Sequence, residues 1–196
     1  MFTGIIKDMG VIKKVQNGSD AFNLRIETAL TNQIHSKLGD SIAVNGVCLT
    51  ITKLYNDGFE VNIMPETVRR TNVHQLQEKS QVNLEPALLP TDRIDGHFVL
   101  GHVDTTATLI KKQVEKNAVT FSFKFPHKYA RYIVEKGSIA LDGVSLTIVS
   151  VYQSTFSVSL IPHTLEHTIL KQLQMGSLVN LETDILGKYI LNQGEK

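Results

Sequence analysis

The feature that most constrains this chain is an internal repeat. Residues 41–51 (SIAVNGVCLTI) align with residues 138–148 (SIALDGVSLTI), an offset of 97 positions. The same offset holds without a gap as far as VNLE, which stands at 82–85 and again at 179–182. Such self-similarity predicts two similar domains that arose by duplication, each of ordinary domain size.

The repeat divides the chain into three segments. The first domain is expected at 1–90 and the second at 97–185, and 186–196 is expected to form a short C-terminal helix and tail that contacts other subunits. Residues 86–96 contain two prolines and two aspartates, which is typical of a linker. Each half is small for an independent core, so packing between domains or chains is expected to stabilise it.

Both halves are predicted to consist mainly of strands. Residues 47–52 (VCLTIT) alternate with a period of two and are rich in β-branched side chains. The dipeptides Asn45-Gly46 and Asp142-Gly143 suit two-residue type I′ hairpins, in which both residues take positive φ. Short strands with closely spaced turns favour an all-β fold with short helices, built as two tandem homologous Greek-key closed β-barrels plus a short C-terminal helix. The short helices are expected at Leu30–Leu38, Pro126–Val134 and Ile185–Leu191.

Composition and charge exclude several functional classes. The chain has 20 Lys and Arg against 19 Asp and Glu, so no basic field is available for nucleic acid or a membrane surface. No stretch approaches the roughly 18 apolar residues of a membrane span, and the N-terminus lacks the features of a secretory signal. Cys48 is the single cysteine, which rules out an intrachain disulfide and fits a reducing cytoplasm. We therefore expect a cytoplasmic protein without membrane or nucleic-acid partners.

Strand alternation separates core side chains from candidate ligand contacts. Within 47–52 the apolar odd-numbered residues share one face, and Cys48 and Thr50 share the other. The repeat places Ser145 and Thr147 in the same relation in the second half. The branched set is predicted to fill the barrel, and the small polar set to face solvent, a partner or a ligand. A lone cysteine is usually a small buried hydrophobe, but this placement leaves a ligand-facing role equally open.

Two polar residues mark positions where the halves differ. The offset pairs His102 with Ile5, and Lys136 with Gly39. Duplicated domains that differ at a few polar positions suggest that one copy has specialised. Periodicity alone leaves a structural role and a functional role equally open for both residues.

The histidines do not predict a metal site. His163 to His167 (HTLEH) fits the H-x-x-E-H pattern of one zinc-peptidase class. Such a site needs a helix that holds both imidazoles, together with a third ligand. Here the segment directly follows a strand, and its counterpart at 66–70 is ETVRR. The possible ligands between 95 and 104, including His97, make an equally weak case, so no metal is expected.

Several segments taken together resemble the riboflavin synthase family. They are MFTGII at 1–6, NGVCLT at 45–50, MPETVRRT at 64–71, GHVD at 101–104, DGVSLT at 142–147, IPHTLE at 161–166 and LGKY at 186–189. Each motif alone is weak. Their order within a duplicated chain makes the resemblance specific, and it extends over nearly the whole sequence.

The resemblance implies a homotrimeric transferase that uses no metal or redox cofactor. Members of the family dismutate 6,7-dimethyl-8-ribityllumazine by moving a four-carbon unit from one molecule to another, which yields riboflavin and 5-amino-6-ribitylaminouracil. Each barrel is expected to hold one lumazine, and the active site to form where the N-terminal barrel of one chain meets the C-terminal barrel of its neighbour. Two related pockets suit two identical substrates, because holding the rings together supplies a high effective molarity. Lumazine synthase is a further possible protein partner.

The resemblance also assigns substrate-binding residues to each barrel. The N-terminal pocket is expected to contain Gly4, Ile5, Ile6, Cys48, Leu49, Thr50, Asn62, Ile63, Met64, Pro65, Glu66 and Thr67. The C-terminal pocket is expected to contain Gly101, His102, Val103, Ser145, Leu146, Thr147, Ser159, Leu160, Ile161, Pro162, His163 and Thr164. Lys136 is expected to contact one of the two ligands from the rim. Backbone groups near 62–64 and 159–161 are expected to pair with the pyrimidinedione edge, and Glu66 and the threonines to take the ribityl chain.

Four of these residues are expected to act in catalysis. His102 is the candidate for proton transfer, since an unperturbed imidazole titrates near neutrality. Cys48 and Ser145 are expected to position the nucleophile or water that adds at C7 of the lumazine, and Thr147 completes the set.

Two other functions remain open at the level of sequence. One is a non-catalytic lumazine- or flavin-binding antenna protein of the same fold, against which the matched motifs in both halves argue. The other is a small β-barrel module that binds nucleic acid or protein. The near-neutral charge of this chain and its lack of tryptophan argue against this second function.

Overall fold

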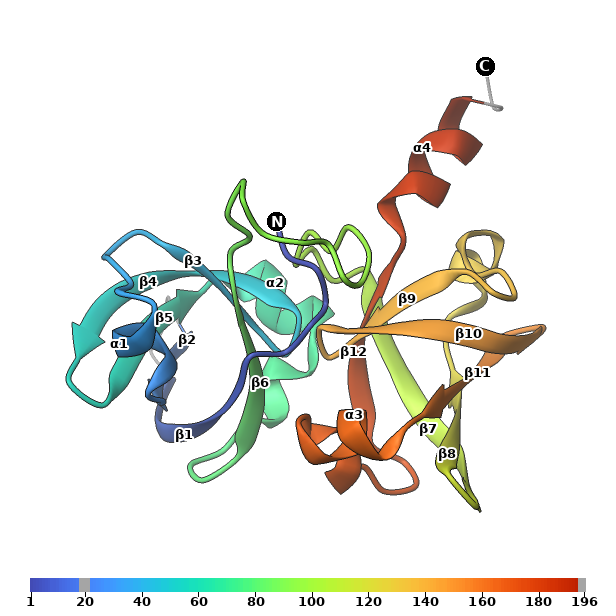
Figure 1. The fold of residues 1–196 in the computed structure, drawn as a ribbon, viewed down its shortest axis with the longest axis horizontal. Coiled ribbons are helices and arrows are strands. Elements are labelled where there is room, and N and C mark those ends of the chain that lie inside the picture. The colour runs from blue at the N-terminus through green and yellow to red at the C-terminus, as the bar shows by residue number, and fades with distance from the viewer. Residues whose placement is uncertain (18–21, 194–196) are drawn as a thin grey trace.

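Two β-barrels lie side by side, and a short helix stands out from the second one (Figure 1). This arrangement comes from a computed structural model that describes residues 1–17 and 22–193. Positions 18–21 of the predicted first domain and 194–196 of the predicted tail lie outside the described residues. No helix in the described ranges is long and apolar enough to cross a membrane.

Six antiparallel strands close the first barrel in the order β1-β2-β5-β4-β3-β6. They are β1 (Asp8–Asn17), β2 (Phe22–Glu27), β3 (Ser41–Val44), β4 (Val47–Tyr55), β5 (Gly58–Ile63) and β6 (Gln81–Pro86). Pairing of β6 with β1 completes the closure. Hairpins join β3, β4 and β5, and β2 lies beside β5, as in a Greek key.

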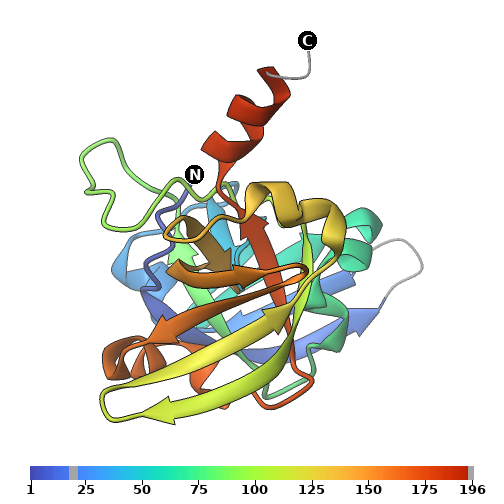
Figure 2. The same ribbon diagram turned by 90° about the vertical axis from the view of Figure 1, so that its right-hand side faces the viewer.

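The second barrel repeats the same circular order with β7, β8, β11, β10, β9 and β12. Its strands are β7 (Thr105–Glu115), β8 (Ala118–Lys124), β9 (Ser138–Leu141), β10 (Val144–Tyr152), β11 (Thr155–Leu160) and β12 (Leu178–Thr183). The last helix, α4 (Ile185–Gln193), projects away from the barrels in both views (Figures 1 and 2). The predicted all-β fold, with two tandem Greek-key barrels and a C-terminal helix, is confirmed.

The connections contain short helices, some of which the sequence did not predict. The α-helices are α1 (Leu30–Gln33), α2 (Pro65–Arg70) and α3 (Pro162–Glu166), and the 3-10 helices are η1 (Asn72–Gln75), η2 (His127–Tyr132) and η3 (Ile169–Gln172). The helix predicted at 30–38 is only one turn long, and the one predicted at 126–134 is a 3-10 helix. Helices α2 and α3 were missed, although each begins at a proline, a residue whose fixed φ suits the first helical position.

The two predicted hairpins have the expected backbone. Asn45 and Gly46 have φ of 46° and 74°, and Asp142 and Gly143 have φ of 43° and 81°. Val44 pairs directly with Val47 across the first of these turns. Positive φ at both central residues matches the right-handed twist of the flanking strands, as a type I′ turn requires.

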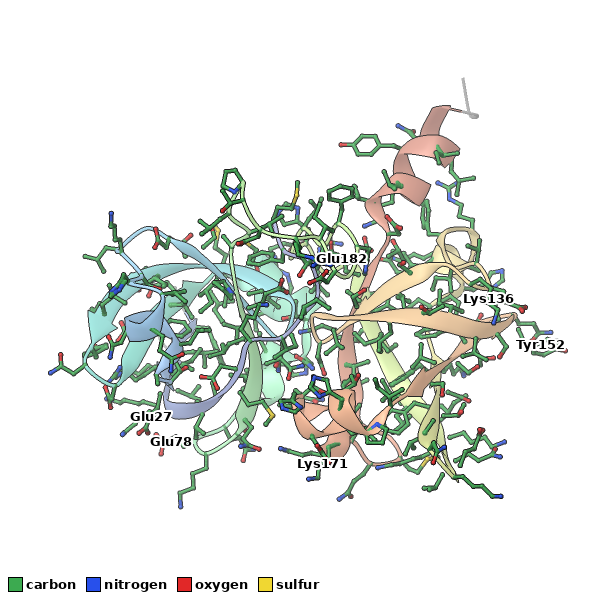
Figure 3. All side chains as sticks on the ribbon, in the orientation of Figure 1. Glu27, Glu78, Lys136, Tyr152, Lys171 and Glu182 are labelled. Atoms are coloured by element: carbon green, nitrogen blue, oxygen red, sulfur yellow. The ribbon has the colours of Figure 1, made fainter. Side chains whose placement is uncertain are left out.

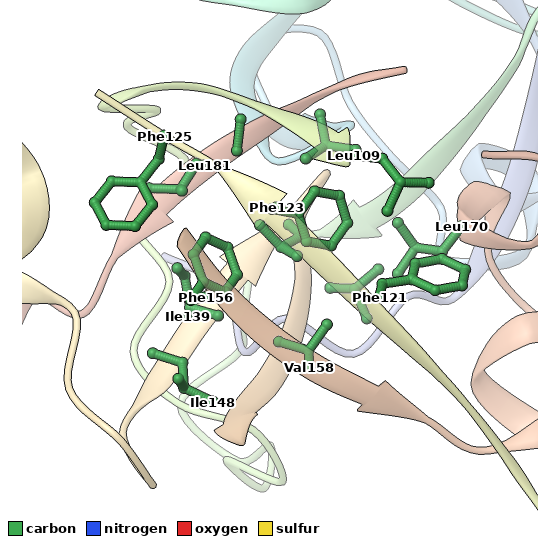
Figure 4. Packing of buried hydrophobic residues seen from close by; sticks show 14 of the residues in the cluster. Leu109, Phe121, Phe123, Phe125, Ile139, Ile148, Phe156, Val158, Leu170 and Leu181 are labelled. Atoms are coloured by element: carbon green, nitrogen blue, oxygen red, sulfur yellow. The ribbon is translucent and has the colours of Figure 1, made fainter. Parts of the chain in front are cut away.

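The barrel interiors follow the predicted alternation. Val47, Leu49 and Ile51 are buried in the first core, while Cys48 is half-buried and Thr50 is exposed. The second core is aromatic, and Figure 4 shows its phenylalanine rings packed together between the strands. Burial of these apolar surfaces supplies the main favourable term in folding.

Candidate active site

Two extended segments cross between the barrels. The first arm, residues 1–7, precedes β1, and the second arm, residues 96–104, precedes β7. Phe2 and Val99, which the offset of 97 makes equivalent, form an antiparallel bridge at the crossing. Phe2 N donates to Val99 O at 2.7 Å, and Val99 N donates to Phe2 O at 3.1 Å. Each arm therefore passes the other and reaches the barrel that it does not lead into.

The second arm covers the first barrel at Cys48. Cys48 N donates to Gly101 O at 2.8 Å. A Cβ built on Gly101 would lie 2.6 Å from Cys48 Cβ, and Gly101 has φ of +76°, so glycine alone fits this contact. The side chain of Val103 packs against the core of the first barrel. His102, between them, is exposed.

The first arm makes the matching contact with the second barrel. Ser145 N donates to Gly4 O at 2.8 Å, and a Cβ on Gly4 would lie 2.6 Å from Ser145 Cβ. Ile6 packs against the core of the second barrel. The predicted grouping is corrected here, because residues 4–6 lie with Ser145 and residues 101–103 lie with Cys48. The sequence predicts that each arm stays with its own barrel, and the long-range backbone contacts reveal the exchange.

Two buried glutamates hold the arms in place. Glu85 on β6 accepts hydrogen bonds from Thr3 N (2.7 Å), Thr3 Oγ1 (2.9 Å) and Gly4 N (3.0 Å). Its repeat counterpart Glu182 on β12 accepts from Leu100 N (2.7 Å) and Gly101 N (2.9 Å). Figure 3 shows Glu182 near the junction of the two barrels. Burial raises the pKa of both carboxyls above the ordinary value, and the N–H donors oppose that rise.

The two hairpin turns meet at the same junction. A Cβ on Gly46 would lie 2.5 Å from Gly143 N, so the turns touch backbone to backbone. Asn83 Nδ2 donates to Asp142 O at 2.9 Å, and Asn180 Nδ2 donates to the equivalent Asn45 O at 2.8 Å. These buried amides satisfy turn carbonyls of the opposite barrel and thereby fix the docking of the two halves.

Asp142 breaks the symmetry of this junction, since Asn45 occupies the equivalent position. Asp142 Oδ1 accepts from Asn180 N at 2.8 Å and from Asn72 Nδ2 at 3.0 Å. Its Oδ2 has no hydrogen-bond partner among the described residues. Burial raises the pKa of this carboxyl from 3.8 to about 7.

The outward polar faces of β4 and β10 carry the predicted small side chains. Thr50 and Thr147 are exposed, and Cys48 and Ser145 are half-buried beneath the arms. Met64 and its counterpart Ile161 are exposed, with 73% and 56% of their surface accessible. Large apolar side chains left open beside a polar face fit contact with a ligand or another chain.

Some predicted pocket residues turn away from this face. The side chains of Leu49, Ile63 and Leu160 lie in the barrel cores, so these residues have only backbone groups to offer a ligand. Glu66 forms ion pairs with Arg69 (2.6 Å) and Arg70 (2.5 Å), which hold the pKa of its carboxyl below the usual value. The predicted ribityl contact would therefore involve a carboxylate that already has partners.

Lys136 lies at the outer side of the second barrel, apart from Glu182 (Figure 3), and its N donates to Ile148 O at 2.9 Å. It is exposed and has φ of 63°, where the first half has a glycine. The rings of His163 and His167 lie 4.2 Å apart. The described residues contain no cluster of three or more groups able to hold a metal ion.

Sequence reasoning missed the residues that support the site. Glu85, Glu182 and Thr3 were not singled out, although the two glutamates were visible as an identical pair at the offset of 97. His97 was considered only as a weak metal ligand, yet its Nδ1 lies 2.7 Å from Ser145 Oγ. The offset pairs Met1 with Phe98, so His97 has no counterpart in this sequence that could have drawn attention to it.

Fold and site together define a tandem-barrel protein with two related but unequal ligand-binding faces. The family model described as the lumazine binding domain matches residues 3–87 and again 100–184. The riboflavin synthase of Bacillus subtilis is 44% identical over 191 residues, which covers 97% of this chain and 88% of that protein. The riboflavin synthase of Schizosaccharomyces pombe is 45% identical over 192 residues, with 96% and 91% covered. The chain belongs to the riboflavin synthase family of lumazine-binding transferases.

Solved structures support the fold. LumP complexed with 6,7-dimethyl-8-(1'-D-ribityl) lumazine aligns with a TM-score of 0.84 at 24% identity, covering 93% of this chain and 99% of LumP. LumP complexed with riboflavin aligns with a TM-score of 0.86 at the same identity. At this level of identity the match concerns the two-barrel architecture.

Proposed function

We propose that this enzyme converts two molecules of 6,7-dimethyl-8-ribityllumazine into riboflavin and 5-amino-6-ribitylaminouracil by transfer of a four-carbon unit. The observation that carries the proposal is the duplicated polar face, present on β4 and on β10 and covered each time by a glycine of the opposite arm. A reaction between two identical substrates needs two such faces. Orienting both rings supplies catalysis without demanding a strong acid or base from the protein.

Each pocket is proposed to combine one barrel with the arm of the other half. The pocket of the first barrel comprises Cys48, Leu49, Thr50, 62–67 and the arm residues 101–103. The pocket of the second barrel comprises Ser145, Leu146, Thr147, 159–164 and the arm residues 4–6. Lys136 contacts one of the two ligands from the rim. His102, Cys48, Ser145 and Thr147 are the proposed catalytic residues, and His102 belongs to the pocket of the first barrel because its neighbour Gly101 contacts Cys48.

We propose that a homotrimer brings the first barrel of one chain against the second barrel of its neighbour. Helix α4 supports association, since it projects from the body and exposes Leu186, Tyr189 and Ile190. The open Met64 and Ile161 beside the polar faces support contact near the active site. Sedimentation of the purified chain should show the trimer.

Three further assignments belong to this proposal. The domain limits are 1–90 and 97–185, with 186–196 as the association segment, and the matched ranges 3–87 and 100–184 support them. A cytoplasmic location is supported by the single free cysteine, Cys48. Lumazine synthase is the proposed partner in a larger complex.

A non-catalytic lumazine- or flavin-binding protein is the second candidate function. The fold likeness to LumP complexed with lumazine favours it. The higher identity to riboflavin synthases, 44% and 45%, favours the enzyme.

The deciding experiment mixes the purified chain with 6,7-dimethyl-8-ribityllumazine alone and follows riboflavin by absorbance. We expect one riboflavin for every two lumazines consumed, with no added cofactor. Tight binding of lumazine without turnover would support the non-catalytic candidate. Absence of both binding and turnover would contradict both candidates.

A further inference from the structure

The second arm carries an imidazole to the pocket of the second barrel. His97 Nδ1 lies 2.7 Å from Ser145 Oγ, and His97 N donates to Thr3 O at 3.1 Å. The preceding Gly96 packs closely against both arms' contacts, because a Cβ there would lie 2.0 Å from Thr3 O and 2.9 Å from Ser145 Cβ. The crossing of the two arms therefore places the imidazole beside the Ser145 hydroxyl.

Burial favours the neutral form of this imidazole. His97 is 8% exposed, and burial lowers the pKa of its ring, while the charge of Asp184 opposes that shift. A neutral imidazole has one N–H donor and one acceptor nitrogen. In this form, Nδ1 is either donor or acceptor toward Ser145 Oγ.

The surroundings of Nε2 select between these two tautomers. Nε2 is buried and has no hydrogen-bond partner among the described residues. A hydrogen on Nε2 would leave a buried N–H orphaned, which proteins tolerate less often than an under-satisfied acceptor. With the hydrogen on Nδ1, the ring donates to Ser145 Oγ, which leaves the hydroxyl hydrogen of Ser145 free to donate to a ligand.

The first barrel differs at the residue that this imidazole contacts. Cys48 occupies the position of Ser145. A thiol is a weak hydrogen-bond donor, whereas a hydroxyl fixed by an imidazole is an oriented one. The two pockets thus differ in the donor that they present to otherwise similar rings.

We infer that His97 is a positioning residue of the second-barrel pocket, which orients the Ser145 hydroxyl toward the bound lumazine and so makes the two substrate sites chemically unequal. The inference rests on the proposed function. It assigns the better-oriented hydrogen-bond donor to the lumazine held by the second barrel. Because of that difference, two identical substrates bind in different environments and can act differently in the reaction.

The test compares substitutions that separate the two ring nitrogens. In His97→Asn the side-chain amide can donate from the place of Nδ1, whereas in His97→Gln the amide reaches the place of Nε2. We expect His97→Gln and His97→Phe to lose about 100-fold in kcat, since loss of orientation costs this much in well-ordered sites. His97→Asn should stay within about 10-fold of the wild type, and riboflavin binding should change less than about threefold in all three.

His127 offers a matched control outside the proposed site. Its Nδ1 lies 3.1 Å from Ser154 Oγ, but this pair is exposed on the second barrel. His127→Asn should leave turnover unchanged. In a Ser145→Ala background, substitution of His97 should cause little further loss, because the two residues act as one unit.

The outcomes separate the inference from the proposed function. If the wild type itself forms no riboflavin from lumazine, the proposed function fails. If the wild type is active and His97→Phe retains full turnover, the inference is overturned. Equal losses in His97→Asn and His97→Gln, or losses that add to that of Ser145→Ala, would show a purely structural role. Thermal unfolding of each variant checks that the fold is intact, and a variant that does not fold leaves the Asn and Gln pair to decide.

Discussion

The first and second barrels have the same backbone topology and differ in the side chains that it carries. Both close six strands in one order, and both place a type I′ turn and a buried glutamate at equivalent positions. The side chains at the site differ, because the repeat pairs Cys48 with Ser145 and Asn45 with Asp142. The comparison shows that duplication preserved the buried glutamates and turns and changed side chains on the outward face and at the junction.

The two barrel cores also differ in their side chains. In the second barrel Phe123 and Phe125 each have ring centroids 5.6 Å from that of Phe156. The offset places Ile26 and Thr28 at the positions of Phe123 and Phe125. Barrels of one topology therefore accept different packing, provided that the interior is filled.

The largest effect is expected from a substitution that separates the two barrels where their hairpin turns touch. Gly46→Ala would place a Cβ 2.5 Å from Gly143 N, at a φ of +74°. We expect a loss of about 3 kcal/mol or more in the free energy of unfolding, from overpacking added to backbone strain. Chemical denaturation measures this loss.

Gly39→Ala is the matched control, because Gly39 has φ of +91° but nothing within 4 Å of its Cβ position. Its loss should be about 1 kcal/mol, from strain alone. Equal losses in the two variants would show that contact between the turns does not hold the barrels together.

Asn45 and Asp142 occupy equivalent positions at the junction, and exchanging them tests why the two halves differ there. The pKa of Asp142 lies near 7 in the folded chain and near 3.8 when unperturbed. Between these values the folded chain keeps a proton that the unfolded chain has released, so stability falls as pH rises from about 4 to about 7 and the penalty persists above that range. A shift of this size corresponds to about 4 kcal/mol.

Asp142→Asn should remove this pH dependence, since Oδ1 can still accept from Asn180 N and Asn72 Nδ2. The variant should be more stable than the wild type at pH 8 and similar to it at pH 4. The reciprocal Asn45→Asp should introduce a new pH dependence in the first half. Urea unfolding at both pH values measures each effect, and parallel pH profiles for wild type and Asp142→Asn would contradict the assignment.

The smallest expected effect concerns the hydrogen bonds that hold the second arm over the first barrel. Glu182→Gln replaces one acceptor oxygen with an NH₂ group that opposes the N–H donors of Leu100 and Gly101. Loss of a hydrogen bond to a charged group costs roughly 1.5–3 kcal/mol. The second arm should lift more often from Cys48, and alkylation of this thiol should accelerate about 10-fold.

Glu85→Gln is the control, because Glu85 holds the first arm over Ser145 on the other barrel. Alkylation of Cys48 should then stay near the wild-type rate. If Glu85→Gln accelerates it and Glu182→Gln does not, the arms do not cross in solution as the structure shows.

Sequence by itself determined the repeat, the barrel class and the identity of the outward face. The alternation around Cys48 and the Asn45-Gly46 turn follow from local rules of strand geometry and backbone sterics, which need no knowledge of the rest of the chain. The resemblance then supplied the family, and the comparisons confirmed it.

Tertiary structure alone decided which arm covers which barrel. Thr3 reaches Glu85 and Leu100 reaches Glu182, each 82 positions away along the chain. Such contacts depend on how two closed barrels dock, and neither strand period nor residue type encodes that docking locally. His97 shows the consequence, because its place beside Ser145 exists only after the arms have crossed.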